Sequence, residues 1–218
     1  MLKKPKKSLA QNFLIDKNIC KKILAQTIIK NKIVVEIGPG RGFLTDLIIE
    51  KNPKKLILIE KDNKLSEYLK IKYSDKKNVE IINKDILKYN LFDHKNLTFI
   101  SNLPYNIATR IILCLFNYSS YIDEMIFMIQ KEVSIKFDYN IFNMNKYKFL
   151  NNLFCNYQRC FDISPNVFKP KPKVISTVVK FKFKNNKINL KKMNTFIEKI
   201  FKNKRKKIKS KIQINDKN

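Results

Sequence analysis

Ile33-Val34-Val35-Glu36-Ile37-Gly38-Pro39-Gly40-Arg41-Gly42-Phe43 contains all three glycines of this 218-residue chain. Its first five residues form a short β-branched run, which predicts a buried strand at 33–37. From 43 to 51 the apolar residues recur at helical spacing and predict a helix. Glycines between a strand and a helix let the backbone approach a ligand, whose anionic group can use the exposed amides at the helix N-terminus. An ordinary tight turn is the alternative.

Strand and helix patterns continue to alternate after this segment. Four more segments have the apolar pattern of buried strands: 55–59, 79–82, 97–101 and 124–129. Helices are expected between them at 63–73 and 109–116. This alternation predicts an α/β fold with a mostly parallel sheet. Such sheets bind ligands at the carboxyl ends of their strands, and four unusual residues fall there: Gly38, Glu60, Asp85 and Asn102.

The formal net charge of +28 is distributed unevenly. Residues 33–62 carry five basic and five acidic side chains, whereas residues 169–218 carry 18 basic and two acidic ones. Codons rich in A and T explain part of this lysine content, but they do not explain its placement. A cation-dense segment beside a neutral region suits a polyanion. We therefore expect contact with nucleic acid rather than a merely solvated basic face.

Composition excludes several other classes of protein. With 44% hydrophobic and 11% aromatic residues the chain can bury a core, so it is not disordered throughout. No apolar run approaches the roughly 20 residues of a membrane span, and the basic start lacks the apolar stretch of a secretory signal. The four cysteines show no C-x-x-C spacing and there is one histidine. We expect a cytoplasmic protein that binds neither membrane nor metal.

A second motif, Asn102-Leu103-Pro104-Tyr105, follows the strand expected at 97–101. Pro104 disfavours helix at Leu103 and fixes a turn at the strand end, so the Asn102 amide and the Tyr105 ring can face one cleft. The alternative is a simple strand-ending turn, in which Asn102 is a local cap and Tyr105 a core residue. After residue 168, an alternating stretch predicts a strand at 176–183, and residues 190–212 predict a basic helical tail.

The pattern Glu36-x-Gly38-x-Gly40-x-Gly42, with Glu60 closing the next strand, resembles the methyl-donor site of S-adenosylmethionine methyltransferases. A nicotinamide fingerprint would place its third glycine one residue later. The resemblance implies that the two oxygens of Glu60 hold the two ribose hydroxyls of the donor. The alternative for Glu60 is a surface acid opposite Lys61.

The glycine loop and Asn102-Leu103-Pro104-Tyr105 together resemble the active site of enzymes that methylate amino groups of nucleic acids. This resemblance implies that the Asn102 side-chain oxygen and the Leu103 carbonyl accept the hydrogens of an adenine amine. It also implies that Tyr105 stacks on the flipped base. No histidine is needed, because the donor carries its own leaving group and positioning supplies much of the catalysis.

Six motifs follow one another along nearly the whole chain: Gln11-Asn-Phe-Leu14, Glu36-Ile-Gly-Pro-Gly40, Asn102-Leu-Pro-Tyr-Asn106, Gln130-Lys-Glu-Val133, Phe168-Lys-Pro-Lys-Pro-Lys-Val174 and Phe201-x-x-Lys-Arg-Lys-x-Ile208. In this order they resemble the small-subunit ribosomal RNA adenine dimethyltransferases, the KsgA family. The resemblance implies S-adenosylmethionine-dependent dimethylation of two adjacent adenosines in the 3′-terminal hairpin of that RNA. The implied partner is an immature 30S subunit, so the implied role is in ribosome biogenesis, by a monomer.

The family also implies a fold and a set of site residues. The fold is Rossmann-like, with a seven-stranded, mostly parallel sheet in a methyltransferase domain at 1–184 and a reduced, helical C-terminal region at 185–218. The donor would contact these residues: Asn12, Leu14, Gly38, Gly40, Glu60, Lys61, Asp85, Ile86 and Asn102. The RNA would contact a basic group: Lys204, Arg205, Lys206, Lys207 and Lys209. Phe168 would stack on the target base opposite Tyr105.

Several of these residues also have a purely structural interpretation. Asp85 is otherwise a cap for the following turn, Phe168 a core residue, and Phe13 with Leu14 an apolar staple for a helix that starts near Asp16. The chain also departs from the family at Tyr147-Lys-Phe-Leu150, where Tyr-Gly-Arg-Leu is expected. Two rival functions remain at this point: an erythromycin-resistance methylase acting on large-subunit RNA, and an assembly factor that binds immature subunits without catalysis.

Overall fold

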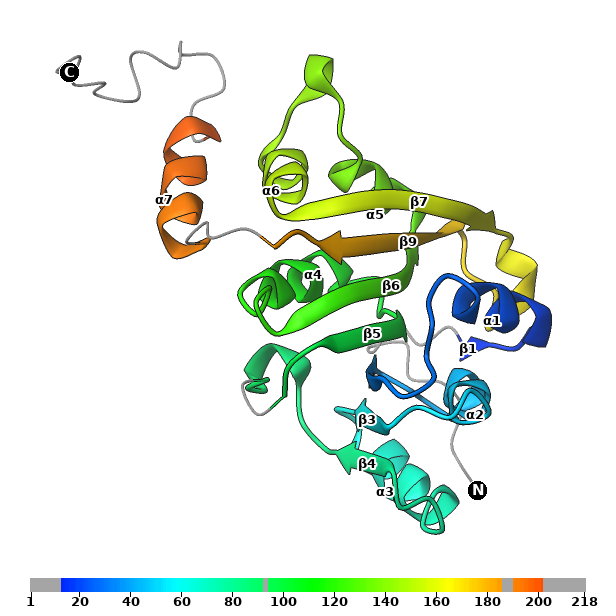
Figure 1. Ribbon diagram of the computed structural model, residues 1–218. Coiled ribbons are helices and arrows are strands. Elements are labelled where there is room, and N and C mark those ends of the chain that lie inside the picture. Colours follow the sequence, from blue (N-terminus) through cyan, green and yellow to red (C-terminus); the bar gives the residue numbers. More distant parts are fainter. Residues whose placement is uncertain (1–12, 92–93, 186–189, 202–218) are drawn as a thin grey trace, which may run out of the picture.

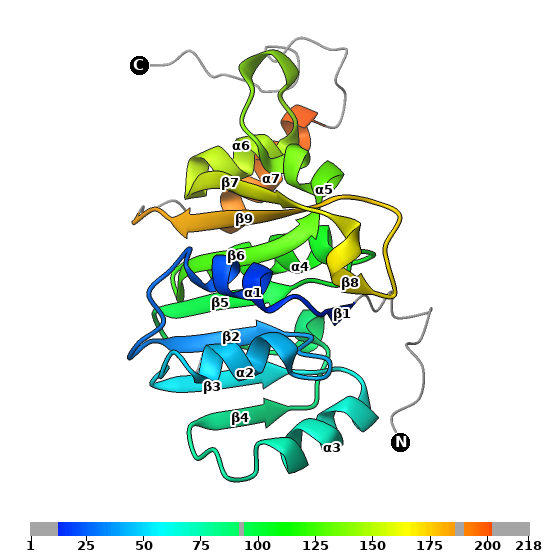
Figure 2. The ribbon, with the colours of Figure 1, turned by 90° about the vertical axis from the view of Figure 1, so that its right-hand side faces the viewer.

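The computed structural model of this protein describes residues 13–91, 94–185 and 190–201. Its centre is a seven-stranded sheet, which Figures 1 and 2 show from two sides. In spatial order the strands are β4 (Val79–Ile82), β3 (Lys55–Ile59), β2 (Ile33–Ile37), β5 (Leu97–Asn102), β6 (Ile122–Gln130), β9 (Ser176–Phe183) and β7 (Cys155–Ile163). The first five are parallel to one another, and β9 is antiparallel to both of its neighbours. The predicted mostly parallel sheet of seven strands is therefore confirmed.

Helices cover both faces of the sheet. Figure 2 shows α1 (Lys17–Leu24) and α2 (Phe43–Ile49) in front of it and α4 (Ala108–Phe116) behind. The remaining helices are α3 (Asn63–Lys72), α5 (Lys131–Phe137), α6 (Lys146–Phe154) and α7 (Leu190–Phe201). The described residues contain no helix with the length and apolar character needed to span a membrane.

Two apolar clusters hold these layers together, one on each face. Alternate residues of a strand point to opposite faces, so Val34 packs with α1 and α2 while Val35 packs with α4. The cluster on the α4 face is rich in phenylalanine. In it the Phe116 ring lies edge-on to Phe154, Phe181 and Phe183, with ring centroids 5.3–6.4 Å apart. The parallel strands are buried on both faces, which explains their almost continuous apolar sequences.

Elements in the second half of the chain were harder to predict. The sequence patterns predicted no element at α5, α6 or β7. Strand β7 lies at the edge of the sheet and mixes exposed with buried side chains, so it lacks an apolar run. The predicted tail helix begins as α7, where Ile197 is buried in the same cluster as α4. Residues 202–212 lie outside the described residues, and the division at residue 184 stays a prediction.

The buried carboxyl of Glu36 ties β2 to α2. It is 2% exposed, and the Thr45 hydroxyl donates a hydrogen bond of 2.7 Å to its Oε2. Burial raises the pKa of Glu36 to about 8, because the charged carboxylate would lose its hydration. The folded chain therefore keeps this proton at neutral pH, whereas the unfolded chain releases it.

This difference predicts a pH-dependent stability. As the pH rises from about 5 to about 8, the free energy of unfolding should fall, because unfolding then releases the Glu36 proton. The variant Glu36→Gln keeps an oxygen that accepts from Thr45 but has no proton to release. Its unfolding free energy should fall less over the same interval. Urea unfolding of both proteins across this range measures the difference, and parallel curves would contradict the assignment.

Candidate active site

The candidate site lies where the chain reverses its direction of travel across the sheet. From β2 the chain moves outward through β3 to β4, and it then returns to the other side of β2 as β5. Strands β2 and β5 pair only as far as Val35 and Phe99. Beyond that point the Ile37 N–H donates to the Ser101 hydroxyl at 2.7 Å, and the Gly38 N–H donates to the Ile59 carbonyl at 2.9 Å. Parallel sheets bind ligands at such a reversal.

The two sequence motifs meet at this place. A Cβ atom added to Gly38 would lie 3.9 Å from Cγ of Pro104, so the glycine loop and the Asn102–Tyr105 turn face each other at van der Waals distance. Asn102 is half-buried at the end of β5, opposite Met128 of β6. The next residue, Leu103, is buried, and its N–H donates to the Met128 carbonyl at 3.1 Å. This hydrogen bond to β6 therefore fixes the position of the Leu103 backbone.

The glycine loop has a backbone conformation that other residues adopt at a cost. The φ angles of Gly38 and Gly42 are 63° and 79°, in the left-handed region. At Gly42 there is also no room, because an added Cβ would collide with the Tyr73 hydroxyl. Packing as well as conformation therefore requires glycine at position 42, and contact of the loop with a ligand stays a prediction.

The end of α3 holds the outer side of this loop. The Tyr73 hydroxyl lies 2.7 Å from Oδ1 of Asp46 and 3.1 Å from the Gly42 carbonyl, both of which can accept its hydrogen. The Lys72 ammonium donates to Oδ2 of Asp46 at 2.7 Å and to the Arg41 carbonyl at 3.2 Å. These contacts fix the start of α2, which has no side-chain cap of its own.

Glu60 holds the inner side of the loop. This carboxylate is 6% exposed; its Oε2 accepts the Gly40 N–H at 3.2 Å and its Oε1 accepts the Asp62 N–H at 2.9 Å. Burial raises the pKa of Glu60, while the two backbone donors oppose that rise. The alternative interpretation of Glu60 as a surface acid opposite Lys61 is therefore wrong. Lys61 instead pairs with Oδ2 of Asp85 at 2.8 Å.

Asp85 and Ile86 follow β4 at the same edge of the sheet. The Oδ1 of Asp85 accepts the Leu87 N–H at 3.0 Å and caps the short 3₁₀ turn Ile86–Lys88. The ion pair with Lys61 lowers the pKa of Asp85, which keeps it charged at neutral pH. Ile86 is buried. The capping role is thus present in the structure, and contact of Asp85 or Ile86 with a donor stays a prediction.

Tyr105 reaches across to β9. Its hydroxyl lies 2.6 Å from the Ser176 hydroxyl, and burial raises the pKa of this tyrosine. Tyr105 is half-buried, so its burial does not decide between the core interpretation and an exposed role. Stacking on a base is a prediction that the structure leaves open.

Leu14 and Phe168 lie together in a small second sheet. Strand β1 (Phe13–Leu14) pairs antiparallel with β8 (Phe168–Lys169), which places Leu14 opposite Phe168. Both side chains are buried in the cluster beneath α1 and α2, and Phe168 is only 4% exposed. Stacking of Phe168 on a base stays a prediction, and it would require this buried ring to become accessible. The core interpretation of Phe168 fits the burial that the structure shows. Asn12 and the basic group at 204–209 lie outside the described residues.

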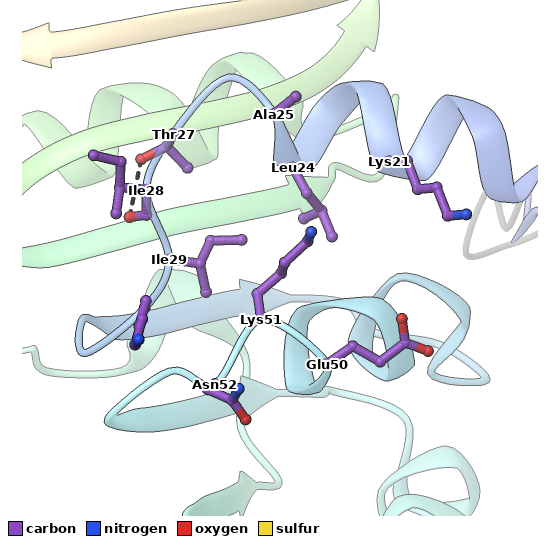
Figure 3. Close-up of a pocket in the computed structure, with 10 residues that line it drawn as sticks. Lys21, Leu24, Ala25, Thr27, Ile28, Ile29, Glu50, Lys51 and Asn52 are labelled. Carbon is purple, nitrogen blue, oxygen red and sulfur yellow. Dashed lines mark hydrogen bonds between the residues drawn. The ribbon is translucent and has the colours of Figure 1, made fainter.

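The cavity drawn in Figure 3 is a different feature. It has a volume of about 420 Å³ and lies between the end of α1 and the end of α2, beside the amino ends of β2 and β3. None of the predicted site residues that the structure describes lines it. In the described part of the chain, no three His, Cys, Asp or Glu side chains gather as a metal site would require.

Several residues that build the site escaped the sequence analysis. Asp62 caps α3 and donates its N–H to Glu60, and the pattern of an aspartate just before a helix could have indicated the cap. Ser101, Ser176 and Tyr73 act through contacts with residues 64, 71 and 31 positions away, respectively. No local pattern in the sequence predicts partners at such separations.

Comparison with known proteins gives the family. A family model described as ribosomal RNA adenine dimethylase matches residues 2–218. A protein of Pelagibacter ubique named ribosomal RNA small subunit methyltransferase A is 41% identical over 198 residues, which are 88% of this chain and 75% of the relative. A protein of the same name from Sulfurihydrogenibium is 39% identical and covers 96% of this chain and 85% of its own.

Solved structures agree with the fold. A dimethyladenosine transferase from Plasmodium falciparum superposes with a TM-score of 0.81 at 26% identity, covering 93% of this chain and 75% of the other. The 23S rRNA methyltransferase ErmE superposes with a TM-score of 0.75 at 22% identity, over 88% of this chain and 79% of its own, which shows a shared fold. With the family model covering nearly every residue, the chain belongs to the ribosomal RNA adenine dimethylase family.

Proposed function

We propose that this enzyme uses S-adenosylmethionine to dimethylate the N6 amines of two adjacent adenosines in the 3′-terminal hairpin of small-subunit ribosomal RNA. It acts on an immature small subunit in the cytoplasm. The observation that carries the proposal is the meeting of Gly38 and Pro104, which joins the donor motif and the amine motif in one site. The curated relatives are named for the small subunit, which favours this RNA over that of the resistance methylases.

The residues around the glycine loop fit S-adenosylmethionine. Each oxygen of Glu60 accepts one backbone N–H, so each keeps a further lone pair for a ribose hydroxyl. Gly38 carries no side chain that would fill the space beside Pro104. When bound, the donor supplies a methyl group on a positively charged sulfur. Asp85 and Ile86 would lie beside its adenine, and Leu14 would border the site from β1.

The amine side of the site must raise the reactivity of a poor nucleophile. The lone pair of the adenine amine is delocalised into the ring, and acceptors that draw on its hydrogens favour the tetrahedral, more nucleophilic nitrogen. The Asn102 side-chain oxygen and the Leu103 carbonyl provide two such acceptors from adjacent residues. Tyr105 stacks on the extruded base. These residues position and polarise the amine, so a strong general base is not required.

Incubation of the purified protein with labelled S-adenosylmethionine and unmodified small subunits tests the proposal. Primer extension across the 3′-terminal hairpin should stop at two adjacent adenosines. Large subunits from the same cells should remain unlabelled. Label in the large subunit would select the resistance methylase instead. A protein that binds small subunits without transferring label would be an assembly factor.

Replacing Asn102 by Ala should lower turnover by about 100-fold or more, which is the scale for removing one preorganised polar contact to a reacting group. The dissociation constant of the donor, measured by calorimetry, should change little, because Glu60 and the glycine loop remain. Asn156→Ala, at an exposed position of β7, is the matched control. Full turnover of the Asn102 variant would show that this side chain has no role in methyl transfer.

Replacing Glu60 by Gln should weaken donor binding about tenfold or more, since the amide turns one acceptor into a donor that faces a backbone N–H. Glu67→Gln, at an exposed position of α3, provides the control for the same chemical change. Calorimetry with S-adenosylhomocysteine measures both variants without turnover. Equal affinities for the two variants would show that Glu60 does not hold the donor.

A further inference from the structure

The loop between α5 and α6 projects from the body of the protein. Figures 1 and 2 both show it as the green loop at the top, beyond the edge strand β7. Its tip is the short 3₁₀ turn Ile141–Asn143, where Phe142 is 98% exposed. Tyr139 and Ile141 beside it are exposed as well. We call residues 138–145 the Phe142 loop.

Hydrogen bonds within the loop hold this ring away from the body. At the tip, the Asn140 side chain accepts the Phe142 N–H at 2.9 Å. At the base, the Asn145 side chain donates to the Lys136 carbonyl at 3.3 Å and accepts the Tyr147 N–H at 2.8 Å. The Phe142 backbone is therefore fixed by a closed turn, and its side chain makes no contribution to the core.

The charges around the Phe142 loop favour an anionic partner. Lys136 and Lys146 are exposed on its two sides, and neither has an ion-pair partner within 13–91, 94–185 and 190–201. The acid of the loop, Asp138, forms an ion pair with Arg159 at 3.6 Å, which partly offsets its charge. A second copy of a chain with a net charge of +28 would be repelled from this surface. RNA offers both the phosphates for the lysines and the flat bases for an aromatic ring.

The loop is also connected to the active site by a short path. Helix α5 starts at Lys131, directly after β6, and β6 carries Met128 opposite Asn102. A helix of seven residues spans about 10 Å, so a short segment of chain links the loop to the strand beside Asn102.

We propose that Phe142 stacks on an unpaired base of the ribosomal RNA substrate, while Lys136 and Lys146 contact the phosphates on either side. This inference rests on the proposed function for the identity of the RNA. It assigns a substrate contact outside the motifs of the family, at the segment that directly precedes the departure at Tyr147-Lys-Phe-Leu150. The loop contributes to docking of the subunit and takes no part in methyl transfer.

Kinetics on unmodified small subunits test the stacking. Phe142→Ala should raise KM for the subunits about tenfold, the scale of losing one base–aromatic stack, with kcat and the donor dissociation constant unchanged. Phe142→Tyr keeps a ring and should behave like the unchanged protein. Ile71→Ala, on α3 and 77% exposed, controls for loss of any exposed apolar side chain. An unchanged KM for Phe142→Ala would overturn the proposal.

A binding measurement separates this inference from the proposed function. Incorporating a photoreactive benzoylphenylalanine at position 142 and irradiating the complex with small subunits should give a crosslink to ribosomal RNA. A crosslink to a ribosomal protein or to a second copy of this chain would overturn the inference. If the protein transfers no methyl group yet crosslinks to RNA, the proposed function fails and the inference stands. If it methylates the hairpin but Phe142→Ala binds subunits normally, only the inference fails.

Discussion

The separation of β2 from β5 is the constraint on which the site depends. Strand β2 pairs with β3 along all five residues but with β5 over only three, and the Ser101 hydroxyl takes the Ile37 N–H where the ladder ends. A buried backbone N–H without a partner would be costly, so this one side chain allows the strands to part without penalty. Gly38 follows β2 and Pro104 follows β5 where the two strands part, and they face each other there at van der Waals distance. The glycine loop is attached to the first of these strands and the Asn102–Tyr105 turn to the second.

The glycine loop depends on α3 for its shape. Both ends of this helix contact the loop: the Asp62 cap shares Glu60 with Gly40, and Lys72 with Tyr73 holds Arg41, Gly42 and Asp46. A loop held by a neighbouring helix is preorganised, which lowers the conformational entropy that a ligand must otherwise remove on binding. The rule that position 42 is glycine therefore comes from tertiary packing as much as from local turn chemistry.

The sequence predicted the central sheet well because buried parallel strands and amphipathic helices leave strong local patterns. The strands from β2 to β6 lie within two residues of their expected bounds, and the prediction that Gly38, Glu60, Asp85 and Asn102 fall at the carboxyl ends of strands followed from topology alone. The pattern failed at β7, whose edge position removes the apolar run. The burial of Phe168 was not predicted either, because a motif gives the identity of a residue and not its packing. The partners of Ser101 and Tyr73 are distant in sequence and leave no local trace.

Acidic and basic side chains lie in different places, one suited to the methyl donor and the other to RNA. Five acids lie at or near the glycine loop in a chain with a large positive net charge: Glu36, Asp46, Glu60, Asp62 and Asp85. Burial keeps Glu36 protonated at neutral pH, while its ion pair keeps Asp85 charged, so the local field is set by burial as well as by sequence. A positively charged methyl donor is favoured beside carboxylates, whereas RNA phosphates are repelled from them and attracted to lysines. The methyl donor and the RNA therefore need surfaces of opposite charge. The exposed lysines Lys136 and Lys146 lie on α5 and α6, away from the acids around α3.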